Sequence, residues 1–113
     1  MREDFKLYTV IEDDSVGQAL SLAAIEHSSR LIERIFDAIV WRLARDPLCG
    51  TPFMDASGTQ HRVLYPLSIK KAKNPSMIVR YTVDEKSDEV TIHRIVVMPY
   101  DPNHAHHASE YTL

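Results

Sequence analysis

The sequence predicts an α+β domain: an N-terminal strand, then two helices packed on one face of an antiparallel sheet that a three-stranded C-terminal meander completes. Two observations carry this prediction. Apolar residues between positions 31 and 43 recur at the spacing of one helix face. Three later segments are rich in β-forming residues and are separated by polar turns. Because the helical segments precede consecutive strands, the helices should cover one side of the sheet.

Length and composition favour a single soluble domain over residues 1–113, with an irregular tail at 99–113. Hydrophobic residues make up 44% of the chain and charged residues 26%, which excludes disordered and fibrous classes. No apolar run approaches the roughly 20 residues of a membrane span, and the first residues are acidic, unlike a signal peptide. Cys49 is the only cysteine, as suits a reducing compartment. We therefore expect a cytoplasmic protein without membrane contact.

The N-terminal half should contain one strand and both helices. Residues 5–11 are rich in β-formers and should join an edge of the sheet. Ser15-x-x-Gln18 is typical of a capping box, opening a helix over about 16–26. Ser28 or Ser29 can cap the second helix, which Asp46-Pro47 ends. Its apolar stripe consists of Leu31, Ile32, Ile35, Phe36, Ile39, Val40 and Leu43.

The C-terminal half should form the meander. Residues 48–60 are typical of a loop, and strands are expected at 61–69, 77–83 and 90–98. A basic turn should join the first two strands, and a hairpin over 84–89 the last two.

The alternation of side chains along the last two strands predicts which residues face outward. Met77, Val79, Tyr81 and Val83 have the pattern of a core face, so Arg80 should point away from it. In the last strand the core candidates are Val90, Ile92, Val96 and Met98, which leaves His93 outward and Arg94 among the core residues. Either a bulge displaces Arg94 or it has a buried partner, and the alternation cannot distinguish these.

The charge of the chain is unevenly distributed. The formal net charge is −3, which argues against a protein that coats nucleic acid non-specifically. No Asp or Glu occurs from Ala56 to Val83, however, and this segment is rich in cations. They are Arg62, Lys70, Lys71, Lys73 and Arg80. The segment can therefore present a cationic surface.

Four stretches in order resemble the RelE/ParE superfamily of toxins from bacterial toxin–antitoxin pairs, over roughly residues 5 to 98. They are Arg42-Leu43-Ala44-Arg45-Asp46-Pro47-x-x-Gly50, His61-Arg62-Val63-Leu64-Tyr65, Ile78-Val79-Arg80-Tyr81-Thr82-Val83-Asp84-Glu85 and Val90-Thr91-Ile92-His93-Arg94-Ile95. Two arginines of the ribosome-dependent members are replaced here, one by Ile78 and one near Met98-Pro99-Tyr100.

The resemblance implies a toxin that cleaves messenger RNA in the ribosome and is neutralised by an antitoxin protein. Attack by the RNA 2′-hydroxyl needs a base, an acid and a cation. The catalytic candidates are Arg80, His93 and Tyr111, and the substrate-binding candidates are Arg62, Lys70, Lys71 and Lys73. His104, His106 and His107 are further histidines that could act as base or acid.

No cofactor or metal is expected, because the sequence contains no glycine-rich phosphate loop and no zinc-ligand spacing. The alternative to an endonuclease is a catalytically inactive binding module on the same fold, either similar to the gyrase inhibitors of the superfamily or a non-toxic relative. Such a module would use the exposed sheet face or an edge strand. A homodimer joined through the helices or an edge strand is also open.

Overall fold

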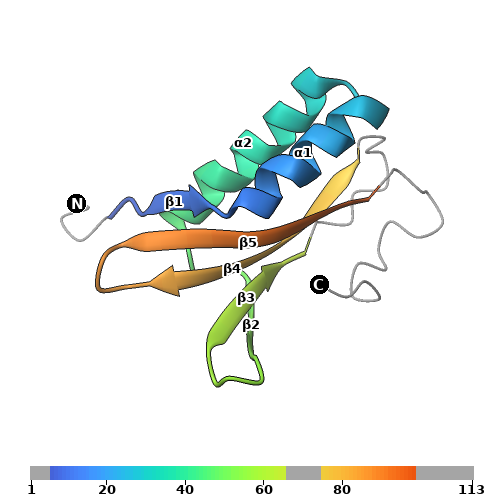
Figure 1. The fold of residues 1–113 in the computed structure, drawn as a ribbon. Helices are drawn as coiled ribbons and strands as arrows, with labels where there is room; N and C mark the ends of the chain where they lie inside the picture. The colour runs from blue at the N-terminus through green and yellow to red at the C-terminus, as the bar shows by residue number, and fades with distance from the viewer. Residues whose placement is uncertain (1–5, 66–74, 99–113) are drawn as a thin grey trace.

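The computed structural model describes residues 6–65 and 75–98, and it has the predicted α+β class (Figure 1). Seven elements follow one another along the chain: β1 (Thr9–Glu12), α1 (Asp14–Glu26), α2 (Ser29–Arg45), β2 (Thr51–Met54), β3 (Gln60–Leu64), β4 (Ser76–Asp84) and β5 (Glu89–Met98). Neither described helix is long and apolar enough to cross a membrane.

The five strands form one mixed sheet in the order β1-β5-β4-β3-β2. The predicted meander is present as β3, β4 and β5, which pair antiparallel. Two expectations were wrong. β1 does join an edge, but it pairs with β5 in parallel, so the sheet is not purely antiparallel. Residues 51–54, expected in a loop, form β2 through antiparallel pairing with β3.

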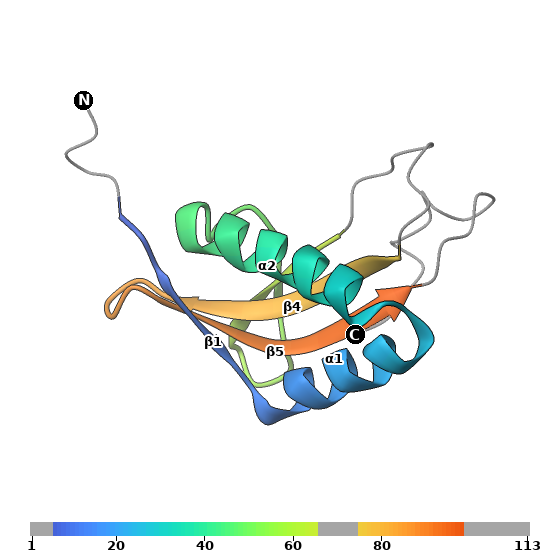
Figure 2. The same cartoon turned by 90° about the horizontal axis from the view of Figure 1, so that it is seen from above.

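Both helices lie on the same side of the sheet and run across β4 and β5 (Figures 1 and 2). Asp13, rather than the expected Ser15 box, caps α1, and its side chain accepts the Ser15 backbone N–H. Ser28 caps α2 as expected, accepting the N–H of Leu31. The helix ends at Arg45, directly before the predicted Asp46-Pro47 stop.

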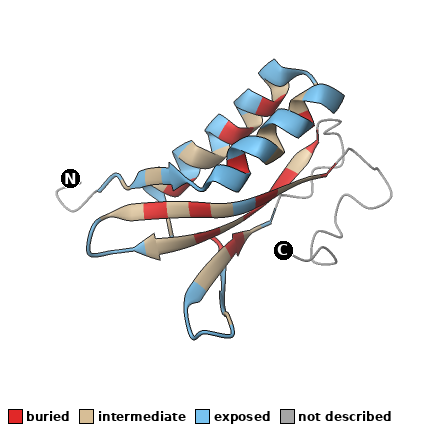
Figure 3. Ribbon diagram, viewed as in Figure 1, coloured by how far each residue is buried: buried red, intermediate tan, exposed pale blue. Residues whose placement is uncertain are grey.

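The main core lies between the helices and the sheet. Figure 3 marks the buried residues in red on both helices and on the strands. Its buried members come from both layers: Val16, Ala23, Ile32, Phe36, Leu43, Met77, Val79, Tyr81, Val90, Ile92 and Ile95. The expected alternation along β4 is therefore confirmed, with Met77, Val79 and Tyr81 toward the helices.

A β-bulge in β5 changes which residues face the helices. Arg80 pairs with Arg94 and Tyr81 pairs with Ile92, so His93 is an extra residue without a partner in β4. Of the two sequence alternatives, the bulge is correct, and Arg94 is exposed. Beyond the bulge the alternation is shifted by one residue. Val96 and Met98 therefore belong to a second apolar cluster with Val63 and Ile78, not to the core of Val90 and Ile92 as expected.

Candidate functional site

Polar side chains from three neighbouring strands meet on the sheet face opposite the helices. Successive residues of a strand point to opposite faces. Since Tyr81 packs into the helix-side core, Arg80 and Thr82 of β4 point the other way. The bulge adds His93 of β5, and β3 contributes His61, whose ring lies beside that of His93. We call His61, Arg80, Thr82, His93 and Arg94 the histidine–arginine cluster.

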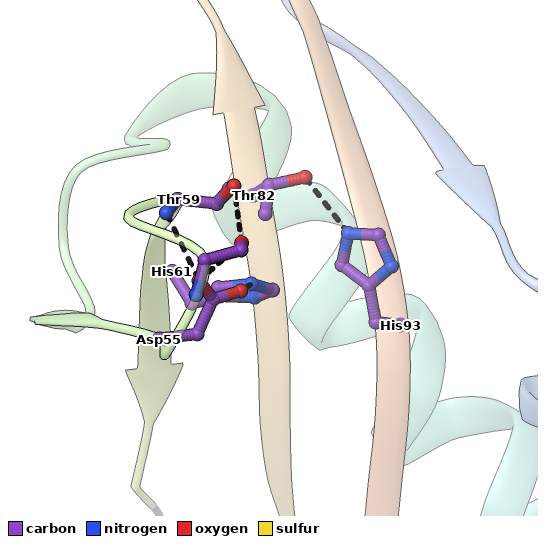
Figure 4. Close-up of polar contacts among 6 residues, drawn as sticks. Asp55, Thr59, His61, Thr82 and His93 are labelled. Atoms are coloured by element: carbon purple, nitrogen blue, oxygen red, sulfur yellow. Dashed lines mark hydrogen bonds and ion pairs between the residues drawn. The ribbon is translucent and has the colours of Figure 1, made fainter.

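His93 is held from both its ring and its backbone. Its Nε2 atom lies 2.8 Å from Thr82 Oγ1 (Figure 4), and its carbonyl oxygen accepts a 3.0 Å hydrogen bond from the Ser15 hydroxyl. Partial burial, followed by the nearby His61 and Arg80, lowers the pKa of His93 below its usual 6.5, and Asp13 opposes the shift. At neutral pH the imidazole is therefore predominantly neutral and available to accept a proton.

His61 is packed on three sides. Its Nε2 lies 2.8 Å from Asp55 Oδ2, its ring stacks on Phe53 at 5.4 Å, and it meets the His93 ring edge-on at 5.5 Å between centroids. An ionised carboxylate only accepts hydrogen bonds, so Nε2 carries the hydrogen toward Asp55. The other nitrogen, Nδ1, is buried and has no hydrogen-bond partner among the described residues.

Asp55 is fixed by the turn between β2 and β3. Its Oδ1 atom accepts hydrogen bonds from the Ser57 hydroxyl (2.7 Å), the Ser57 backbone N–H (2.9 Å) and the Thr59 backbone N–H (2.9 Å). The bond from the Ser57 hydroxyl and that from Thr59 hold the pKa of Asp55 well below its usual range, and the His61 bond adds to this. Asp55 therefore stays ionised and keeps the His61 ring in place (Figure 4).

Two arginines complete the cluster. Arg80 and Arg94 are direct partners in the β4–β5 ladder and lie on the same sheet face. Arg80 is half-buried, and its Nε atom has no hydrogen-bond partner within the described part of the chain. Neither arginine forms an ion pair with a described carboxylate, since the ion pairs found there are Lys6–Asp88 and His61–Asp55.

The structure brings together two of the residues proposed from sequence, Arg80 and His93. Arg62 lies elsewhere: it pairs with Tyr81, on the helix side, and donates to the carbonyl oxygens of Leu48 (3.0 Å) and Gly50 (2.7 Å). Its guanidinium thus ties β3 to the segment that leads into β2. The remaining candidates lie outside the described residues: Lys70, Lys71, Lys73, Tyr111 and the histidines 104, 106 and 107.

Sequence reasoning missed His61, Asp55 and Arg94 as members of the site. His61 meets His93 only through the pairing of β3 with β4 and of β4 with β5, which no local pattern reveals. Arg94 depends on the bulge. The one local signal was Asp55-x-Ser57-Gly58, which is typical of a tight turn in which the aspartate binds its own backbone.

The cluster combines groups suited to acid–base chemistry with groups suited to holding an anion. The described residues contain no group of three or more His, Cys, Asp or Glu side chains placed to hold a metal ion.

Comparison of the chain with protein-family models, with curated proteins and with solved structures finds no match. The likeness to the RelE/ParE superfamily therefore rests on the quoted sequence stretches.

Proposed function

We propose that this chain is a toxin-like RNA endonuclease of a toxin–antitoxin pair that cleaves messenger RNA with the help of the ribosome. The observation that carries the proposal is the contact between His61 and His93, whose ring centroids lie 5.5 Å apart beside Arg80. Two imidazoles and a guanidinium can supply the base, the acid and the cation that metal-independent cleavage of RNA needs.

In this reaction His93 accepts the proton of the 2′-hydroxyl. It can act as the base because its lowered pKa keeps the imidazole neutral at pH 7. The 2′-oxygen attacks the neighbouring phosphorus, and the bond from phosphorus to the 5′-oxygen breaks. His61 acts in its imidazolium form: Asp55 holds the Nε2 hydrogen, and the hydrogen on Nδ1 passes to the departing 5′-oxygen, which leaves His61 neutral. Arg80 stabilises the negative charge that builds up on the phosphate oxygens. The products are a 2′,3′-cyclic phosphate and a 5′-hydroxyl end.

The test is cleavage of messenger RNA by the purified full chain, with and without ribosomes, followed by identification of the new ends. His93→Gln and His61→Gln should each lower the cleavage rate by about 10²–10⁴-fold. His27→Gln is the matched control, because His27 follows α1 at its C-terminal cap and lies outside the cluster. No cleavage by the wild-type chain under either condition would contradict the proposal, as would an equal loss in the His27 variant.

Expression in a bacterial host tests the toxin part of the proposal separately. Induction should arrest growth, and His93→Gln should restore it at equal protein level. Normal growth during full induction of the wild-type chain would show that any RNA cleavage in vitro does not make the chain a toxin.

A second candidate function is supported by β2. This strand is one of the two edges of the sheet, and all four of its residues are exposed, with Phe53 at 40% and Met54 at 61%. An edge with apolar side chains can bind a partner by strand addition. If the chain is an inactive binding module, it should retain a stoichiometric protein partner in a pull-down while cleaving no RNA. Pairing through a new main-chain ladder should be weakened by Met54→Pro, because the register directs the Met54 N–H away from β3, but hardly by Met54→Leu.

A further inference from the structure

The register of β4 and β5 places two positive charges directly opposite each other. Arg80 and Arg94 are ladder partners, and the extra residue His93 keeps both on the face away from the helices. Like charges at directly opposed positions of a sheet destabilise it. This arrangement is therefore unfavourable unless a negative group lies between the two guanidinium groups.

The chain itself supplies no such group within its described residues. Asp55 uses Oδ1 for the β2–β3 turn and Oδ2 for His61, and Asp13 caps α1. The Nε donor of Arg80 is buried without an acceptor. Arg62 differs, because two carbonyl oxygens accept from its guanidinium. A buried donor with no acceptor costs folding free energy, and a bound ligand could supply the acceptor that Arg80 Nε lacks.

We infer that Arg80 and Arg94 form a binding site for an oxyanion of the phosphate class. A guanidinium offers paired N–H donors that match two oxygens of a phosphate. A bound phosphate would satisfy Arg80 Nε and cancel the repulsion between the two arginines. The inference rests on the proposed function, because it names the residues that would hold the phosphate in that reaction. Neither arginine stands at the position of a superfamily arginine, since those positions are Ile78 and a place near Met98-Pro99-Tyr100.

Thermal unfolding of the full chain tests the site with inorganic phosphate as the probe, against chloride at equal ionic strength. Arg80→Gln and Arg94→Gln are the test variants, and Arg34→Gln, an exposed position of α2, is the control. Phosphate should raise the melting temperature of the wild type and of the control but of neither test variant. Equal stabilisation of all four proteins, or none of the wild type, would overturn the inference.

The repulsion between the arginines gives a second readout. Without phosphate and at low salt, Arg94→Gln should melt about 1–4 °C above the wild type, because it removes one of two opposed charges. Arg34→Gln should not show this increase. A lower melting temperature for Arg94→Gln would overturn the premise that the paired arginines repel each other.

A 2′-O-methyl RNA oligonucleotide distinguishes the source of the phosphate, because it binds like RNA but cannot undergo 2′-hydroxyl attack. Displacement of phosphate by this oligonucleotide would assign the site to an RNA backbone, and binding of inorganic phosphate alone would assign it to a small phosphate compound. Both results support an oxyanion site. Phosphate binding without any RNA cleavage would remove the proposed function and keep this site. If Arg80→Gln and Arg94→Gln cleave RNA as fast as the wild type and are stabilised by phosphate to the same extent, the site is ruled out and the proposed function stands.

Discussion

The two faces of the central strands treat their polar groups in opposite ways. On the helix side, the Tyr81 hydroxyl is buried but accepts a 2.8 Å hydrogen bond from the Gly50 N–H. On the other side, His61 Nδ1 and Arg80 Nε are buried with no partner among the described residues. Folded proteins seldom leave buried polar atoms unpaired without a reason. The fold thus pairs the buried hydroxyl on the helix side, whereas on the opposite side two buried nitrogen atoms have no partner among the described residues.

The largest expected effect comes from Ile92, which is fully buried on the helix side. Ile92→Ala should lower the free energy of unfolding by about 2–5 kcal/mol, because it leaves a cavity in the core. Thr91→Ala, one residue away and only half-buried, should change it by less than about 1 kcal/mol. Urea unfolding measures both. Similar losses for the two variants would show that Ile92 on the helix side contributes no more to the free energy of unfolding than Thr91 on the opposite side.

An intermediate effect is expected at Gly50, where a Cβ atom would lie 2.6 Å from the Tyr81 hydroxyl oxygen and 3.0 Å from the Val63 carbonyl oxygen. Gly50→Ala should therefore cost about 1–3 kcal/mol of unfolding free energy. Gly17 in α1 has open space around it, so Gly17→Ala should instead stabilise the chain by about 0.5–1 kcal/mol. A stabilising Gly50→Ala would mean that the Tyr81 contact is not tightly packed.

The smallest effect concerns pH and the opposite face. The folded chain lowers the pKa of His93 from 6.5, so below that pH the unfolded chain binds the extra proton more readily. Stability should therefore fall as the pH drops through 6.5 toward the folded pKa. His93→Gln should reduce this dependence between pH 5 and 8. Asp55, whose usual pKa is 3.8, affects stability only at lower pH, since its contribution is lost on acidification. Identical pH profiles for wild type and variant would contradict the proposed environment of His93.

Local patterns predicted much of the fold. The apolar stripe and Ser28 located α2, and the alternation from Met77 to Val83 predicted which face of β4 packs against the helices, because both signals lie within a single element. β2 was missed because its exposed Thr-Pro-Phe-Met has no alternation, and only pairing with β3 makes it a strand. The parallel direction of β1 depends on β5, about eighty residues away, and no local signal encodes it.

The candidate site was less predictable than the fold, because it is made by register. The outward direction of Arg80 followed from alternation, but the contact of His61 with His93 requires three strands to be aligned. The bulge was one of two alternatives that the sequence left open. The proposed roles of Lys70, Lys71, Lys73 and Tyr111 stay predictions.

The bulge at His93 also bears on how the chain tolerates changes in length. Deletion of His93 would make Ile92 and Arg94 consecutive partners of Tyr81 and Arg80, so every other residue of β5 would keep its face. Deletion of Thr91 would instead turn Val90 away from the core. Insertion or loss of one codon at position 93 can therefore create or abolish the histidine of the site while the core stays intact. In this strand, a change at the candidate site need not disturb the core.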